Sequence, residues 1–195
     1  MSHDELPPFR SYDAKSESKL LTRVARQPGA SRSGAPEPAP GRDENLVHDD
    51  GLLSLWLLKI TQPAFRQLLE FLLEREPEAA GLLLGPANDD LLVTHFVPDL
   101  TGRGTPASFE LGTVELNEVL QWMKPAGINC KGIAHSHPAG FVSPSHGDLN
   151  YLRRVFGLPS NATAGQFYMP IVSGGRLYPY VYAQGRVWCA ELVLI

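Results

Sequence analysis

Two histidines and one aspartate stand at a spacing that suits a metal site. His135 and His137 are two residues apart in the apolar run INCKGIAHSH, which is typical of a buried strand. Because side chains alternate between the two faces of a strand, both imidazoles are expected on the same side. Asp148 lies eleven residues after His137, just inside a predicted helix, so a short fold-back can bring its carboxylate to the histidines. We therefore predict that these three residues hold one metal ion.

The donor set points to zinc. Two neutral imidazoles and one carboxylate fill three corners of a tetrahedron and leave the fourth to water, as in catalytic rather than structural zinc sites. Zinc lowers the pKa of that water to about 7 and polarises the carbonyl that is attacked. His146 is expected to be a loop residue, since a fourth protein ligand would close the open corner.

A carboxylate must still move the proton, and three glutamates are candidates for this role. Glu78 enters the predicted strand AAGLLLG, which a mixed sheet can place beside the histidine strand, so it is the preferred general base and acid. Glu76 is expected to be a solvated charge after the preceding helix. Glu110 lacks the Gly-rich strand that follows Glu78.

The combined pattern resembles the JAMM signature of the MPN+ (JAB domain) zinc metallopeptidases, in a prokaryotic JAB-type form. It comprises His135-x-His137, seven residues beginning with Pro138, Ser145-x-x-Asp148, and an upstream Glu78-x-x-Gly81. The resemblance implies that His135, His137 and Asp148 bind Zn²⁺ and that Glu78 carries the proton. It also implies that Ser145 hydrogen-bonds the water or the developing oxyanion. Ser145-x-x-Asp148 is equally the pattern of a helix capping box, and one hydroxyl can serve both roles.

The order of predicted elements indicates an α/β protein. Helices are predicted over 61–76, 114–124 and 147–157, and strands over 52–60, 79–85, 91–97, 128–137, 167–174, 176–183 and 186–195. The strands 79–85 and 91–97 flank the turn PANDD and are expected to pair antiparallel. By the resemblance, the fold is an α/β/α sandwich with a mixed, largely antiparallel sheet, similar to cytidine deaminases. Trp56, Trp122 and Trp188 are expected to be core aromatics.

Composition separates a tail from a single domain. Residues 1–50 contain PGASRSGAPEPAPG and are predicted to be disordered, whereas residues 51–195 form the JAMM/MPN+ catalytic domain. The net charge of -4 offers no basic patch for nucleic acid, and the two cysteines do not imply a disulfide framework. No leader is recognisable, and the longest Leu-rich run is too short to cross a membrane. A cytoplasmic location is expected.

The resemblance also suggests the substrate, which is the peptide or isopeptide bond after the C-terminal tail of a ubiquitin-like protein. Such an extended tail is expected to add a strand beside the loop 98–107 and to pass the small residues Ala139 and Gly140. Two alternatives stay open. One is a peptidase that processes a sulfur-carrier protein, and the other is a non-catalytic MPN-like interaction module, which would bind no zinc.

Overall fold

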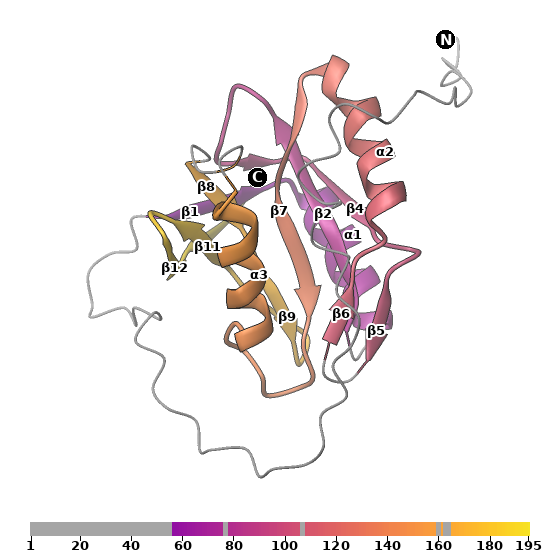
Figure 1. The fold of residues 1–195 in the computed structure, drawn as a ribbon, viewed down its shortest axis with the longest axis vertical. Coiled ribbons are helices and arrows are strands. Elements are labelled where there is room, and N and C mark those ends of the chain that lie inside the picture. Colours follow the sequence, from indigo (N-terminus) through magenta and orange to yellow (C-terminus); the bar gives the residue numbers. More distant parts are fainter. Residues whose placement is uncertain (1–55, 76–77, 106–107, 159–160, 162–164) are drawn as a thin grey trace.

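The computed structural model describes residues 56–75, 78–105, 108–158, 161 and 165–195. The predicted tail, residues 1–50, lies outside the described residues, as does Glu76. The rest is an α/β fold in which helices cover both faces of a mixed sheet, as expected: α1 lies behind the sheet and α3 in front of it (Figure 1). The implied similarity to cytidine deaminases stays an expectation.

All three predicted α-helices are confirmed within a few residues. They are α1 (Gln62–Glu74), α2 (Thr113–Met123), which a 3-10 turn η1 (Lys124–Ala126) follows, and α3 (His146–Phe156). Helix α1 begins with a proline in its first turn, where the missing N–H costs no hydrogen bond. Thr61 occupies its N-cap position, although the hydroxyl donates to the Thr94 carbonyl at 3.3 Å instead of capping the helix.

The large sheet is built around its longest strand, β7 (Ile128–Ser136). One edge of β7 pairs antiparallel with β2 (Ala80–Pro86), which in turn pairs antiparallel with β4 (His95–Pro98). The other edge pairs parallel with β8 (Gln166–Tyr168) and then β9 (Ile171–Ser173). The remaining strands are β10 (Arg176–Tyr178), β11 (Tyr180–Ala183) and β12 (Arg186–Cys189).

Two smaller sheets accompany the large one, and residues 103–105 of the predicted loop 98–107 form a strand of one of them. Strand β1 (Leu57–Ile60) pairs parallel with β13 (Glu191–Leu194) and β3 (Leu92–Val93), and β5 (Arg103–Thr105) pairs with β6 (Ser108–Glu110). The predicted strand 91–97 therefore breaks at Thr94, where the chain passes from one sheet to another.

The three predicted C-terminal strands are in fact six. Pro170 and Pro179 interrupt two of the predicted segments, because a proline has no N–H for the ladder. The third segment divides at Ala190, after which the Glu191 N–H donates to the Trp56 carbonyl and the chain joins β1.

Each face of the sheet carries an apolar core. The core on the α1 face includes Leu58, Ile60, Leu68, Leu72, Leu83 and Val93. The core under α2 and α3 includes Leu82, Leu84, Leu149, Leu152, Phe167 and Ile171. Trp56 and Trp188 pack partly buried against the α1-face core, but the prediction for Trp122 is wrong. Its side chain is 53% exposed, because it lies near the end of α2 on the side turned away from the sheet.

Neither cysteine forms a disulfide: Cys130 and Cys189 are both free. None of the described helices combines the length and the hydropathy that crossing a membrane requires.

Candidate metal centre

Strand β7 presents both predicted histidine ligands from one face. The His135 N–H donates to the Pro170 carbonyl at 3.2 Å and the His137 N–H to the Val172 carbonyl at 2.9 Å, so the backbone of both is fixed by the β9 edge. Their Nε2 atoms lie 3.0 Å apart. The predicted same-face arrangement is confirmed, and the two rings converge on one point.

Helix α3 brings Asp148, the third predicted ligand, to this point. Its N-terminus is closed by a capping box, in which the Asp148 N–H donates to Ser145 Oγ at 3.2 Å and the Ser145 N–H donates to Asp148 Oδ2 at 2.7 Å. Asp148 Oδ1 lies 3.3 Å from His135 Nε2, and Oδ2 lies 3.3 Å from His137 Nε2. The cap therefore holds the carboxylate directly against both imidazoles.

These distances fit a tetrahedral ion. Zinc bonds to imidazole and carboxylate of about 2.0–2.2 Å place neighbouring ligand atoms about 3.4 Å apart. The measured separations of 3.0, 3.3 and 3.3 Å lie close to that value. Within the described part of the chain, His135, His137 and Asp148 are the one group of three or more such side chains that could hold a metal ion. A site with two imidazoles and one carboxylate suits zinc.

The loop after β7 sets the tautomer of His137. The His137 ring presents Nδ1 to the Phe141 carbonyl at 3.2 Å, and donation to a carbonyl places the proton on Nδ1 and leaves the Nε2 lone pair for a metal. The Phe141 N–H donates to the Pro138 carbonyl at 3.1 Å, and the buried Ser173 hydroxyl donates to the same carbonyl at 3.0 Å. Gly140, at φ +92°, supplies the left-handed turn that this loop requires.

Interactions between Asp148 and the two histidines outweigh the effect of burial on the pKa values of Asp148 and His137. Burial acts to raise the pKa of Asp148, but hydrogen bonds from His135 and His137 outweigh it and hold that pKa far below the usual range. Burial acts to lower the pKa of His137, but the hydrogen bond and charge of Asp148 outweigh it, so the pKa of His137 is raised. The Asp148 carboxylate is thus ready to bind a cation without losing a proton.

Glu78 lies just before β2, the strand that pairs with the histidine strand β7. The register pairs Ala80 with His135, and one residue further the Ser136 N–H donates to the Ala79 carbonyl at 2.9 Å. Glu78 precedes the first paired residue of β2 by two positions. Burial raises the pKa of its carboxyl, and the charges of His137 and His135 partly offset this rise.

Comparison with known proteins decides the family. Residues 61–185 match the family described as prokaryotic homologs of the JAB domain. The chain belongs to this family. No curated protein sequence matches the chain significantly.

One solved structure shares the fold of this JAB domain, and a second aligns with it less well. The solution structure of protein DSY2949 from Desulfitobacterium hafniense is similar at 22% identity and a TM-score of 0.56, over 71% of this chain and 92% of that one. The crystal structure of AF2198, a JAB1/MPN domain protein from Archaeoglobus fulgidus, aligns at 19% identity and a TM-score of 0.41, over 70% of this chain and 99% of that one. At such identities the first likeness concerns the fold alone.

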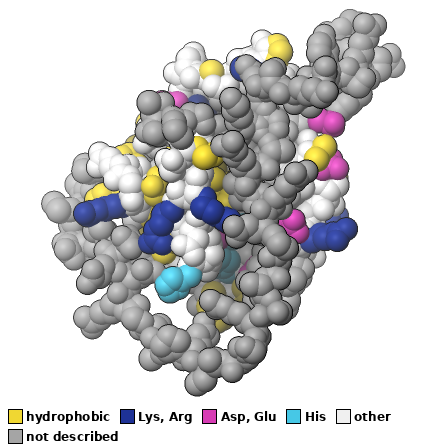
Figure 2. Space-filling model, viewed as in Figure 1, with side chains coloured by type: hydrophobic (Ala, Val, Ile, Leu, Met, Phe, Trp, Pro, Cys, Tyr) yellow, Lys and Arg dark blue, Asp and Glu magenta, His cyan; other side chains and the backbone are white. Residues whose placement is uncertain are grey.

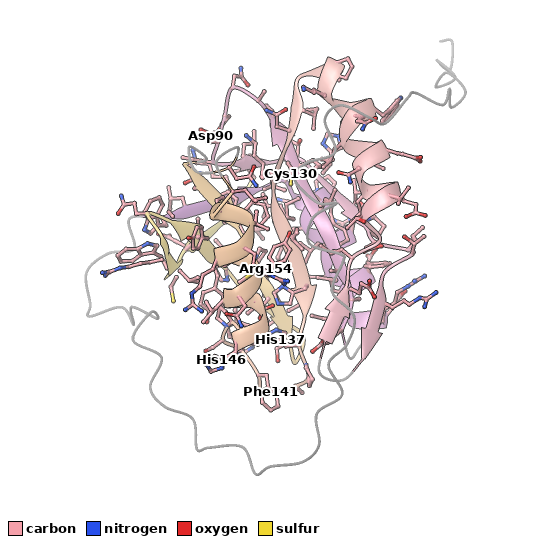
Figure 3. All side chains as sticks on the ribbon, in the orientation of Figure 1. Asp90, Cys130, His137, Phe141, His146 and Arg154 are labelled. Atoms are coloured by element: carbon pink, nitrogen blue, oxygen red, sulfur yellow. The ribbon has the colours of Figure 1, made fainter. Side chains whose placement is uncertain are left out.

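The candidate metal group of the JAB domain is recessed below an exposed loop. His137 is 6% exposed, whereas Phe141 is 67% exposed on the neighbouring loop. Figure 3 shows His137, His146 and Phe141 at the same end of the molecule, where β7 ends and α3 begins. Figure 2 shows histidine side chains at the surface beside basic side chains over α3, which carries the exposed Arg153 and Arg154.

The structure also locates the other residues that the sequence singled out. Ser145 is exposed at the α3 cap, next to Asp148. His146 is the exposed first residue of α3 and is not part of the ligand group. Glu110 ends β6 and is exposed, paired in register with Arg103.

Two buried serine hydroxyls near the JAB-domain site are not signalled by the sequence pattern. Ser136 is the residue between the two histidines, and Ser173 lies on β9; their exposures are 0% and 2%. Ser136 bonds to Ala79, 57 residues away in the chain. No local pattern signals such a partner, although a serine within an apolar strand always requires one when it is buried.

Proposed function

We propose that this JAB domain is a zinc-dependent metallopeptidase that hydrolyses the peptide or isopeptide bond after the C-terminal tail of a ubiquitin-like protein. The observation that carries the proposal is the convergence of His135 Nε2, His137 Nε2 and the Asp148 carboxylate within 3.3 Å of one another. A structural zinc site would be closed by a fourth protein ligand, and the described residues supply only three. A non-catalytic module has no need for such a group.

His135, His137 and Asp148 would hold the ion. When bound, zinc acts as a Lewis acid that polarises the scissile carbonyl and acidifies a coordinated water. The Nδ1 bond from His137 to the Phe141 carbonyl and the α3 cap on Asp148 keep two of the three ligands in the orientation that this requires.

Glu78 is the proton carrier in this proposal. It stands two residues before Ala80, which pairs with His135, and burial raises the pKa of its carboxyl. A carboxylate whose pKa is raised accepts a proton from the attacking water more readily, and its protonated form can then donate to the leaving amine. One side chain therefore serves both halves of the hydrolysis.

Ser145 is proposed to stabilise the negative charge that develops on the carbonyl oxygen of the substrate beside the metal. Its hydroxyl oxygen accepts the Asp148 N–H at 3.2 Å, and the hydroxyl also lowers the pKa of the Asp148 carboxyl. The side chain is exposed toward solvent beside the ligand group, so an incoming carbonyl oxygen can approach it.

The hairpin of β5 and β6 supports an extended substrate. Its two strands form a separate sheet and, among the described residues, pair only with each other, so each keeps an outer edge to which a third strand can add. The hairpin follows β4, the strand next to β2, and β2 in turn is preceded by Glu78. A ubiquitin-like C-terminal tail, being extended, has the shape that such an edge accepts.

A cleavage assay tests the proposal. Ubiquitin-like proteins, each extended at the C-terminus by a reporter, would be incubated with the zinc-loaded chain, the chelated chain and the chelated chain with zinc restored. We expect cleavage directly after the tail in the first and third samples only. Cleavage of sulfur-carrier fusions alone would select the alternative substrate. A chain that binds no zinc and cleaves none of the fusions would exclude the peptidase.

A further inference from the structure

Ser136 is a fully buried polar side chain between the two histidine ligands. Since side chains alternate along β7, its hydroxyl lies on the opposite face of the sheet from His135 and His137. The neighbours agree: Ala79 and Ala134 belong to the core on the α1 face, whereas Ala80, paired with His135, belongs to the core under α3. Ser136 therefore cannot be a ligand or touch the substrate at the metal.

The hydroxyl of Ser136 replaces a backbone acceptor. In an antiparallel ladder, two hydrogen-bonded residues exchange both N–H···O bonds. Here the Ser136 N–H donates to the Ala79 carbonyl at 2.9 Å, but the Ala79 N–H donates to Ser136 Oγ at 2.9 Å rather than to the Ser136 carbonyl. The hydroxyl in turn donates to the Ala79 carbonyl at 3.5 Å. The side chain thus bridges the two strands just where the regular pairing of β2 with β7 stops at Ala80.

This bond controls the peptide group that follows Glu78. The Ala79 N–H belongs to the same peptide plane as the Glu78 carbonyl, so its direction fixes the backbone torsion of Glu78 and the course of its side chain. Without the hydroxyl, the buried Ala79 N–H would have to find another acceptor, and the end of β2 would shift relative to β7.

We propose that Ser136 is a positioning residue for Glu78: through the Ala79 amide it holds the proton carrier in register with the strand that bears the two histidines. The inference rests on the proposed function for the role of Glu78. The middle residue of the His-x-His sequence would therefore act on the face of the sheet opposite the two histidines.

Metal-free protein tests the geometry. By NMR, the Ala79 amide should exchange roughly ten- to a hundredfold faster in Ser136→Ala than in the wild type, because its acceptor is lost. The chemical shifts of the Glu78 side chain should change in Ser136→Ala and return toward the wild-type values in Ser136→Thr, which keeps the hydroxyl. Ser173→Ala, another buried serine beside the site, should leave the Ala79 amide protected.

Kinetic measurements test whether Ser136 affects catalysis through Glu78. In the wild-type background, Ser136→Ala should lower kcat/KM at least about tenfold, whereas in a Glu78→Gln background it should change the residual rate less than about twofold, since both substitutions remove the same contribution. Bound zinc should stay at the wild-type ratio. Should Ser136→Ala not fold, Ser136→Cys, with its weaker acceptor, serves the same comparisons.

The outcomes separate the two proposals. An unchanged Ala79 exchange rate and unchanged Glu78 chemical shifts in Ser136→Ala, or equal losses of activity in both backgrounds, would overturn the positioning role. If no substrate is cleaved by any variant, the proposed function fails, while the exchange and chemical-shift measurements in metal-free protein still decide whether Ser136 positions Glu78.

Discussion

Ser145 and Asp148 close the N-terminus of α3 with two reciprocal hydrogen bonds, and one of them uses Oδ2, the carboxylate oxygen that also lies 3.3 Å from His137 Nε2. The acidic residue of the capping box is therefore also the predicted third ligand. A cap fixes the side-chain torsions of its acidic residue, so helix formation itself orients the carboxylate toward the two histidines.

Removing the cap should affect stability and metal binding together. Ser145→Ala is expected to lower the free energy of unfolding of the metal-free protein by about 1 kcal/mol, the usual cost of losing a serine N-cap. It should also weaken zinc binding, because the Asp148 side chain becomes free to rotate. Urea unfolding and competitive zinc titration measure the two effects. A loss of stability with unchanged zinc affinity would show that the cap does not orient the carboxylate.

The chain should bind about one zinc ion, as expected of one three-ligand site. His137→Ala and Asp148→Ala should each reduce the bound zinc strongly, because two protein ligands hold the ion too weakly. His146→Ala is the matched control, since His146 begins the same helix but does not belong to the ligand group. Elemental analysis after dialysis gives the ratio. A wild-type zinc ratio in His137→Ala and Asp148→Ala would place the site elsewhere.

Glu78→Gln should separate metal binding from catalysis. The substitution keeps the volume of the side chain and removes the proton carrier, so zinc should stay bound while kcat falls by roughly a hundred- to ten-thousandfold. Glu110→Gln, an exposed carboxylate on β6, should keep wild-type activity. Cleavage of the ubiquitin-like fusion reports both. Near-normal turnover by Glu78→Gln would mean that another group carries the proton.

Zinc binding should depend on pH through His137. The raised pKa of His137 means that the metal-free protein keeps a proton on this ring to a pH above the ordinary value of about 6.5, and zinc must displace it. The pKa of Asp148 lies far below this range, so that carboxyl releases no proton. Apparent affinity should therefore rise by about tenfold per pH unit below the His137 pKa and level off above it. Competitive titrations across this range measure the slope, and an affinity independent of pH would contradict the assignment.

Gly81 should resist substitution for a packing reason. A Cβ at Gly81 would lie 2.4 Å from the Phe96 ring and 2.6 Å from the Val97 carbonyl on β4, so the β2–β4 pair would have to separate. Gly81→Ala is expected to cost about 1–3 kcal/mol of stability. Gly165→Ala is the control, because its Cβ would meet nothing within 4 Å. Urea unfolding of metal-free protein compares them, and equal midpoints would show that the strands adjust freely.

The sequence by itself determined the parts of the site that depend on local geometry. Two residues apart on a strand means the same face, so His135 and His137 were predictable as a pair. A serine three residues before an aspartate at a helix start forms a cap whatever lies beyond it, so Ser145 and Asp148 were predictable too. Helix periodicity likewise located α1, α2 and α3.

Only the tertiary structure decided the relationships between distant strands. The register of β2 against β7 pairs Ala80, two residues after Glu78, with His135, and it joins Ser136 to Ala79. A slip of one residue would have reversed the faces on which the side chains of β2 lie. The local pattern likewise did not predict that Trp122 is exposed or that β3 pairs with β1. The physical reason is that the local sequence shows which side chains are apolar enough to be buried. Which strand or helix covers them depends on the packing of the whole domain.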